Sequence, residues 1–254
     1  MAYEKHKRRP PQEDDGTLIE GRNAVLETLR SGRAVDKIFL AEGAHLADVA
    51  AEAKKHGVPT VTCDRRKLDH MSVTGTHQGV IAQVAAYEYS TVEDILNKAK
   101  EKGEAPFIFL LDDIEDPHNL GAIIRTANLA GAHGVIIPKR HAAGLTSTVA
   151  KTSAGALNYT PVAKVSNLGQ TIEELKKEGM WFVCADMGGD LMYNLNLTGP
   201  MGVVIGNEGE GVSRLVKEKC DFVAAIPMKG DIDSLNASVA AGILAYEVVR
   251  QRMK

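Results

Sequence analysis

The stretch Ile226-Pro-Met-Lys-Gly-Asp-Ile-Asp-Ser-Leu-Asn-Ala-Ser238 says more about the fold than any other part of the chain. An apolar strand is predicted before it, and a polar loop leads from the proline into the final helix. Ser234 and Asn236 both stand where a helix N-cap is expected, and capping alone would explain both residues. The helix that follows is rich in small residues, so we expect it to pack closely against another segment.

Apolar strands alternate with helical patterns through the second half of the chain. The predicted strands are residues 107–111, 134–137, 181–185, 202–205 and 222–226. Unbroken runs rich in Val and Ile, separated by helices, indicate an α/β domain built on a parallel sheet that is covered on both faces. Ligands of such sheets gather at the carboxyl ends of the strands, so the loops after the strands are the first places to search for a site.

The loop after the first of these strands begins Asp112-Asp-Ile-Glu-Asp-Pro-His-Asn-Leu-Gly. It leads into a helix that is predicted to begin near Asn119, where helix capping is a structural explanation for the asparagine. Arg125 is a lone cation on this mostly apolar helix. Two explanations of Arg125 are open: a structural salt bridge to Asp112 or Glu115, or a role in a functional site.

A second unusual loop lies within residues 203–213, Val-Val-Ile-Gly-Asn-Glu-Gly-Glu-Gly-Val-Ser. Its glycines, Gly206 among them, permit a ligand or another segment to approach the backbone closely. Glu208 is a candidate for orienting a cation, although an exposed turn carboxylate would explain it equally well. The spacing does not match G-x-G-x-x-G and no G-K-[ST] follows, so neither a dinucleotide oxidoreductase nor a P-loop protein is supported.

The charge balance is close to neutral, with 30 basic and 33 acidic residues and a formal net charge of -3. Any nucleic-acid surface must therefore be local, because phosphate contacts usually leave a basic excess. One candidate is a basic cluster in residues 1–16, which are predicted to form a disordered tail. A solvated tail explains this cluster equally well, and its members are Lys5, Lys7, Arg8 and Arg9.

Other composition features exclude several classes of protein. No apolar run approaches the roughly 20 residues that span a bilayer, and the start lacks the apolar segment of a signal peptide, so we expect a cytoplasmic protein. Cys63, Cys184 and Cys220 lie far apart without C-x-x-C spacing. They predict neither a disulfide framework nor a metal site, and we expect them to be buried as small apolar residues.

The first part of the chain is predicted to form a second, smaller domain and a connecting helix. Residues 17–89 alternate short helices and strands and indicate a small α/β domain, in which the segment 18–29 continues into a helical pattern of Ala24, Val25 and Leu29. Residues 90–105 are predicted to form a connecting helix. Ser90 and Glu93 would be its capping box, and Gly103 would end it.

The three motifs, taken in order, resemble those of the SpoU branch of the SPOUT RNA methyltransferases, also called the TrmH family, over about residues 107–250. The segments Ile19-Glu-Gly-Arg-Asn-Ala-Val25 and His77-Gln-Gly-Val80 resemble the family's substrate-binding domain, which is like ribosomal protein L30e. The bacterial 23S rRNA guanosine-2′-O-methyltransferase subgroup (RlmB-like) is the most similar. The resemblance implies an L30e-like domain over residues 17–89 and a SPOUT domain over residues 106–254, with a parallel sheet and a deep trefoil knot.

The resemblance also implies an activity, the methylation of a ribose 2′-hydroxyl, on a guanosine of 23S rRNA, by S-adenosylmethionine without a metal. Gly206, Ile226 and Leu235 match the family's cofactor-contacting positions. In the family, the arginine that matches Arg125 is proposed as the base, but a free guanidinium stays protonated at neutral pH. The alternative is that Arg125 binds the adjacent phosphate and stabilises the alkoxide, with Glu208 orienting it. The side chains implied around the hydroxyl are Asn119, Arg125, Glu208, Ser234 and Asn236.

The implied partners are structured RNA and a second copy of the chain, since family members are homodimers. The N-terminal domain would select the RNA, and its basic residues are either phosphate contacts or ordinary surface charges. The alternatives are a tRNA ribose methyltransferase, an antibiotic-resistance rRNA methyltransferase and a non-catalytic RNA-binding factor of ribosome assembly. The L30e-like domain argues against the plain tRNA type. The candidate phosphate contacts are Arg22, Arg30, Arg33, Arg65, Arg66 and Lys67.

Overall fold

The computed structural model describes residues 17–232 and 234–253, which form two compact units that divide between Ala85 and Ala86. The basic cluster at Lys5 to Arg9 lies outside the described residues. In the part of the chain that the structure describes, no helix has the length and apolar character needed to cross a membrane.

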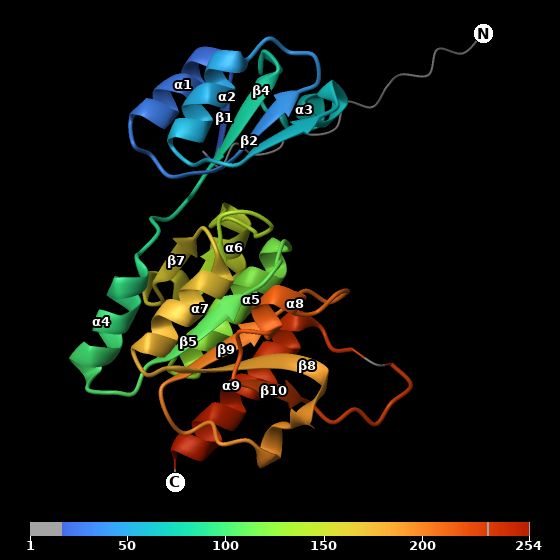
Figure 1. The fold of residues 1–254 in the computed structure, drawn as a ribbon. Helices are drawn as coiled ribbons and strands as arrows, with labels where there is room; N and C mark the ends of the chain where they lie inside the picture. Colours follow the sequence, from blue (N-terminus) through green and yellow to red (C-terminus); the bar gives the residue numbers. More distant parts are fainter. Residues whose placement is uncertain (1–16, 233, 254) are drawn as a thin grey trace. The chain divides into compact units, whose positions relative to one another are not determined.

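The N-terminal unit is a four-stranded mixed sheet in the order β1-β4-β2-β3 (Figure 1). Val25 and Val49, from the first two helices, pack with Ile38 on one face, and Leu68 of the third helix packs with Phe39 on the other. The elements are β1 (Leu18–Glu20), α1 (Arg22–Arg30), β2 (Val35–Ala41), α2 (Ala47–Lys55), β3 (Thr60–Cys63), α3 (Arg65–Met71) and β4 (Val80–Val84).

Two details of this unit differ from the sequence prediction. The helical pattern of Ala24, Val25 and Leu29 lies within α1, whereas strand β1 was not predicted, and Leu18–Glu20 pairs with β4. Gly21 separates the two elements with a φ of 90°, a conformation that favours glycine. Helix α3 was not predicted, since Leu68 is its only buried residue and so it shows no apolar period.

The C-terminal unit is a parallel sheet of six strands in the order β10-β8-β9-β5-β6-β7, which confirms the predicted α/β class. Ile95 of α4 and Ile172 of α7 join Ile108 and Leu110 in one apolar core, and α5 packs against α9 and α6. The strands are β5 (Phe107–Leu111), β6 (Gly134–Pro138), β7 (Val162–Val165), β8 (Trp181–Leu191), β9 (Met201–Ile205) and β10 (Phe222–Ala225). The helices are α4 (Val92–Lys102), α5 (Pro117–Leu129), α6 (Ser147–Thr152), α7 (Leu168–Lys177), α8 (Arg214–Lys217) and α9 (Ala237–Arg252).

The helix starts in this unit lie at other residues than predicted. Helix α4 is capped by a box of Thr91 and Asp94, one residue after the predicted pair. Helix α5 begins at Pro117, and its N-cap Asp116 accepts a hydrogen bond from the His118 N–H, so Asn119 is not a capping residue. Proline favours the first helical position because its fixed φ suits a helix start.

Two strands of the C-terminal unit and the burial of the cysteines in both units differ from the sequence prediction. Strand β7 was not predicted, and β8 continues six residues beyond the predicted end at Ala185, as far as Leu191. Among the cysteines, only Cys184 is buried, whereas Cys63 and Cys220 are half-buried.

The strand order creates a crevice between two neighbouring strands of the sheet. Strand β5 leads through α5 to β6 on one side, whereas β9 leads through α8 to β10 on the other. Such a reversal leaves room for a ligand at the carboxyl ends of the strands. The loops after β5 and β9 meet there, because the Asp112 N–H donates to the Ile205 carbonyl at 2.8 Å.

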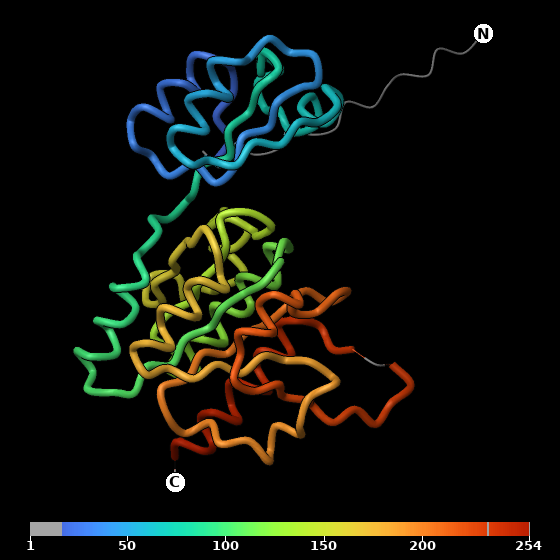
Figure 2. The backbone as a smooth tube through the Cα atoms, viewed as in Figure 1, coloured from blue at the N-terminus to red at the C-terminus, as the bar shows by residue number. Residues whose placement is uncertain are grey.

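The end of α9 is fastened to the connection that precedes β9 (Figure 2). The Gln251 side chain accepts from the Leu197 N–H and donates to the Leu195 carbonyl, at 2.8 and 3.0 Å. Arg252 donates to the Gly199 carbonyl at 2.7 Å. Such contacts are expected if the C-terminal segment passes through the connection before β9. The trefoil knot itself stays a prediction.

Candidate active site

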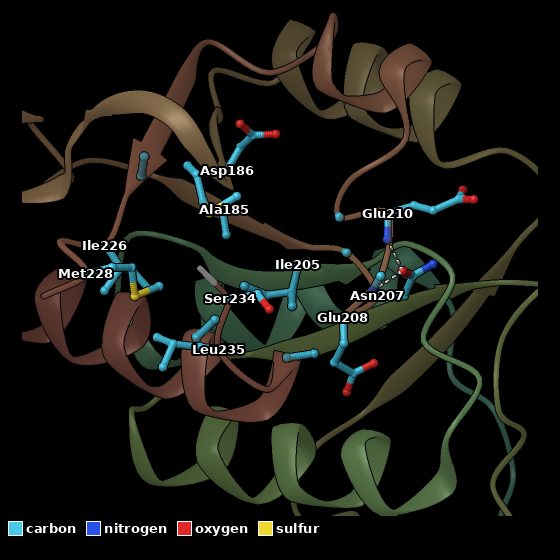
Figure 3. A pocket seen from close by; sticks show the side chains of 17 residues that line it. Ala185, Asp186, Ile205, Asn207, Glu208, Glu210, Ile226, Met228, Ser234 and Leu235 are labelled. Atoms are coloured by element: carbon cyan, nitrogen blue, oxygen red, sulfur yellow. Dashed lines mark hydrogen bonds between the residues drawn. The ribbon is translucent and has the colours of Figure 1, made fainter. Parts of the chain in front are cut away.

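A pocket lies at the carboxyl ends of β9 and β10 and beside the middle of β8, and three predicted cofactor positions, Gly206, Ile226 and Leu235, line it together (Figure 3). Glu208 and Ser234 line the same pocket. In Figure 3, Ile226 and Leu235 lie on one side of Ser234 and Glu208 on the other. Gly206 and Leu235, which are 29 positions apart, thus meet in one hollow that has an apolar side and a polar side.

The glycine loop after β9 folds back closely on itself at Gly206. A Cβ on this residue would lie 2.0 Å from the Gly211 carbonyl carbon and 2.2 Å from the Val212 nitrogen. Both neighbours are backbone atoms and cannot turn aside as a side chain can. Gly206 is therefore required for the loop conformation, whereas a Cβ on Gly209 would have its nearest neighbour at 3.6 Å.

Two side chains fix this loop in place. Asn207 Oδ1 accepts hydrogen bonds from the Gly209 N–H at 2.9 Å and the Glu210 N–H at 2.7 Å. Asp112 Oδ2 accepts from the Ser213 N–H at 2.7 Å, and Asp112 is itself buried. The end of β5 thus holds the far end of the glycine loop.

Three predicted side chains from the three motifs form one hydrogen-bonded network. The Asn119 amide donates to Glu208 Oε1. The Asn236 amide donates to Asn119 Oδ1 at 2.9 Å and to Glu208 Oε1 at 3.3 Å. Asn236 is also the N-cap of α9, where its Oδ1 accepts from the Ser238 N–H. Helix capping explains the contacts of Asn236 Oδ1 but not those of its amide nitrogen. It explains none of the contacts of Asn119.

The other two predicted side chains are placed differently. Ser234 is exposed, lines the pocket and does not cap α9. Arg125 is exposed on α5, outside the residues that line the pocket. Its guanidinium has no ion pair or hydrogen bond with any described residue, so the salt bridge to Asp112 or Glu115 is absent. The structure therefore brings four of the five residues together and leaves Arg125 apart.

Asp186 lines the pocket and was not predicted. Its Oδ2 pairs with the Lys217 ammonium at 2.8 Å and its Oδ1 accepts from the Gly188 N–H at 2.8 Å. The hydrogen bond from Lys217 is the main reason why the pKa of Asp186 lies below its usual range. An acidic residue directly after the predicted strand 181–185 was the available signal, since such positions often bind ribose hydroxyls.

The surroundings of Glu208 are acidic. A hollow beside it is lined by Asp113, Glu115, Asp116 and Glu210. Burial, followed by the neighbouring charge of Asp112, raises the pKa of Asp113. The local potential favours a cationic ligand. Within residues 17–232 and 234–253, no cluster of His, Cys, Asp and Glu is arranged to hold a metal ion.

Comparison with known proteins gives two family matches that together cover most of the chain. Residues 106–246 match the SpoU rRNA Methylase family, and residues 18–90 match the RNA 2′-O ribose methyltransferase substrate binding domain. A relative from Bacillus subtilis, named as the TrmH family tRNA/rRNA methyltransferase YacO, is 53% identical over 238 residues. The match spans 92% of this chain and 95% of the relative.

Solved structures are similar across the same length. The SpoU methyltransferase AviRb from Streptomyces viridochromogenes, in complex with AdoMet, has a TM-score of 0.60 and 27% identity over 93% of this chain and 90% of its own. The AdoMet-bound rRNA methyltransferase from Sinorhizobium meliloti has a TM-score of 0.59 and 25% identity over 92% of this chain and 87% of its own. The chain belongs to the SpoU, or TrmH, family of RNA 2′-O-ribose methyltransferases.

Proposed function

We propose that this protein transfers the methyl group of S-adenosylmethionine to a ribose 2′-hydroxyl of RNA, as its family membership implies. The observation that carries the proposal is the network of Asn119, Glu208 and Asn236 beside the pocket. It joins the three motifs that resemble those of the family. AviRb and the Sinorhizobium enzyme, which match most of the chain, are solved with AdoMet.

The pocket fits this cofactor. The apolar side chains of Ile205, Ile226 and Leu235 would cover the adenine ring, and the tight turn at Gly206 lets backbone groups reach it. The carboxylates of Asp186 and Glu208 suit the positive sulfonium and the ribose hydroxyls. When bound, the cofactor supplies an activated methyl group on sulfur.

The side chains of the network would prepare the ribose hydroxyl. The 2′-oxygen forms the new bond to the methyl carbon as the carbon–sulfur bond breaks, and its proton must leave. Asn119 and Asn236 hold Oε1 of Glu208, and we assign to Glu208 Oε2 the hydrogen bond from the 2′-hydroxyl and the proton that this hydroxyl loses, while the sulfur would leave as a neutral thioether. Ser234 lines the same pocket and would orient the ribose.

We assign to Arg125 the phosphate next to the modified nucleotide, rather than the role of base. Its guanidinium is exposed and engages no other described residue, so a phosphate can reach it.

The exposed apolar side chains of helices α5 and α9 support the proposed homodimer. Helix α5 exposes Leu129 and helix α9 exposes Val239 and Tyr246, each at least 48% accessible. Light scattering would then give twice the 27.3 kDa chain mass, and a monomer would contradict the dimer.

The proposed substrate is a guanosine in 23S rRNA, in the cytoplasm. Support comes from the substrate-binding domain over residues 18–90 and from the match of 92% of this chain to an rRNA methyltransferase. The second candidate is a tRNA, because the name of the Bacillus relative includes both RNAs. Nucleoside mass spectrometry of separated rRNA and tRNA, from cells with and without the gene, decides between them. The proposal requires the loss of one 2′-O-methylguanosine from 23S rRNA, and a loss from tRNA alone overturns this assignment.

A further inference from the structure

The basic side chains of the N-terminal unit differ in whether an acid neutralises them. Arg22 pairs with Asp48 at 2.9 Å, and Arg30 pairs with Glu27 at 3.0 Å. On α3, by contrast, Arg65 and Arg66 are exposed, and neither guanidinium meets an acid or a hydrogen-bond acceptor within the described chain. The Lys67 ammonium of the same helix lies 5.3 Å from the centroid of the Phe39 ring, and Arg33 also has a partner. Of the six basic residues named from the sequence, Arg65 and Arg66 are therefore the two that the described residues leave available.

The acidic residues of α3 are occupied by internal contacts. Asp64 caps the helix through the Arg66 N–H at 2.8 Å. Asp69 Oδ1 lies 2.8 Å from Nε2 of the buried His77. Because Nδ1 of that ring accepts from the Gly79 N–H, Nε2 is the nitrogen that donates to Asp69. Neither carboxylate pairs with an arginine of the helix, so the two guanidinium groups remain available to an anion.

The loop of residues 72–78 is fixed beside this helix. The Glu20 carboxylate accepts from the Ser72 hydroxyl and the Val73 N–H at 2.6 Å each, and from the Thr74 hydroxyl at 2.5 Å. The loop tip at Thr74, Gly75 and Thr76 is nevertheless exposed. A loop held in this way loses little conformational entropy when it binds a partner.

The start of α3 and this loop lie at one edge of the sheet. The Glu42 N–H donates to the Cys63 carbonyl at 3.0 Å, and the Ala41 N–H donates to the Gly79 carbonyl at 2.8 Å. The ends of β2 and β3 and the start of β4 are therefore side by side. Arg65 and Arg66 follow β3 directly, and residues 72–78 precede β4.

We propose that this edge, meaning Arg65 and Arg66 with the loop of residues 72–78, holds the sugar–phosphate backbone of the substrate RNA outside the modified nucleotide. Guanidinium groups bind phosphate through paired hydrogen bonds, and the glycine at the loop tip permits close backbone approach. The inference rests on the proposed function, which supplies the RNA. It adds the surface and the two side chains that would position it.

The test removes two charges from this edge and compares the result with two charges removed elsewhere in the same unit. The variant is Arg65→Ala/Arg66→Ala in the full-length protein. The control is Lys54→Ala/Lys55→Ala in the last turn of α2, where both lysines are exposed. Filter binding to undermodified 23S rRNA and to tRNA, at several salt concentrations, is combined with methyl-transfer kinetics and melting temperatures.

The expected result for the arginine variant is a KM for RNA about tenfold higher, an unchanged kcat and a salt slope lower by about 2. Its melting temperature should match the wild type, since both side chains are exposed. The variant Arg65→Lys/Arg66→Lys should recover most of the salt slope. Equal effects in the lysine control, or no change in RNA affinity, overturn the inference. A failure of the proposed function can be told apart from a failure of this inference, because the wild type itself would then transfer no methyl group to RNA.

Discussion

At the scale of single residues, Asn119 is the central member of the network, since it donates to Glu208 and accepts from Asn236. Asn119→Ala would leave both partners without the amide that aligns them. We expect kcat to fall by on the order of 100-fold, as when a preorganised donor is removed, with little change in cofactor affinity. Initial rates and calorimetry measure the two effects.

Asn128→Ala is the matched control for this variant. It lies on the same helix, and its amide contacts the Thr160 hydroxyl at 3.1 Å, away from the network. A control that loses as much activity as Asn119→Ala would mean that the loss reflects the helix and not the network.

Arg125 permits a second test at this scale, because a cation and a base respond differently to pH. A phosphate contact needs only positive charge, so Arg125→Lys should keep part of the activity and Arg125→Ala should keep far less. Rate profiles between about pH 6 and 9 should have the same shape in the wild type and in Arg125→Lys, since both side chains stay charged there. A new ionisation in the lysine variant would instead support the role of base.

At the scale of structural elements, the glycine loop after β9 depends on close backbone contact. Gly206→Ala would place a methyl group 2.0 Å from the Gly211 backbone. We expect this variant to lose cofactor binding by calorimetry and to melt at a lower temperature. Gly209→Ala, in the same loop, meets its nearest atom only at 3.6 Å and should bind normally. Normal binding by Gly206→Ala would contradict this account of the loop.

The junction of α5 and β6 gives a pH-dependent stability. His133 is fully buried, and its Nδ1 accepts from the Phe107 N–H at 3.0 Å. Burial lowers the pKa of His133, although the hydrogen bond with Glu104 opposes the shift. The unfolded chain therefore takes up a proton at higher pH than the folded protein, so the contribution is complete above about pH 6.5 and is lost as the pH falls below it.

Urea unfolding at about pH 7.5, 6.5 and 5.5 measures this contribution. His133→Gln keeps an acceptor for Phe107 but cannot titrate, so it should lose less free energy of unfolding than the wild type over this interval. Parallel losses in both proteins would show that another group causes the pH dependence.

The sequence predicts the helices and strands better than it predicts which of their residues come into contact. Strands β5, β6 and β9 are buried on both faces, so their unbroken apolar runs are visible in the sequence. Short elements such as β7 and α3 bury too few residues to leave a pattern. The bonds from Asn119 to Glu208 and Asn236 join residues 89 and 117 positions apart, which only the strand order brings together. The paired state of Asp186 likewise depends on Lys217, a residue of α8.

At the scale of the whole molecule, the C-terminal helix is held at both ends. Asn236 ties its start to the network, and Arg252 ties its end to the carbonyls of Ala105, Pro106 and Gly199. Arg252→Ala removes three hydrogen bonds, although the Pro106 carbonyl keeps the bond from the Met201 N–H at 2.8 Å, so we expect the variant to lower the free energy of unfolding by about 1–3 kcal/mol in denaturant titrations. Met253→Ala, on a side chain that is 81% exposed, is the control and should be neutral. Equal stabilities would show that the end of α9 is not fastened by these bonds.

The two units suggest a division of labour in which one holds RNA and the other holds the cofactor and the reacting hydroxyl. Methyl transfer by the purified protein tests this most directly. The protein is incubated with methyl-labelled S-adenosylmethionine and undermodified rRNA, and the RNA is hydrolysed with alkali, which cannot cleave beside a 2′-O-methyl group. We predict label in alkali-resistant dinucleotides with the wild type and almost none with Asn119→Ala. Label only in mononucleotides, or none with any RNA, would contradict the assignment of 2′-O-methylation.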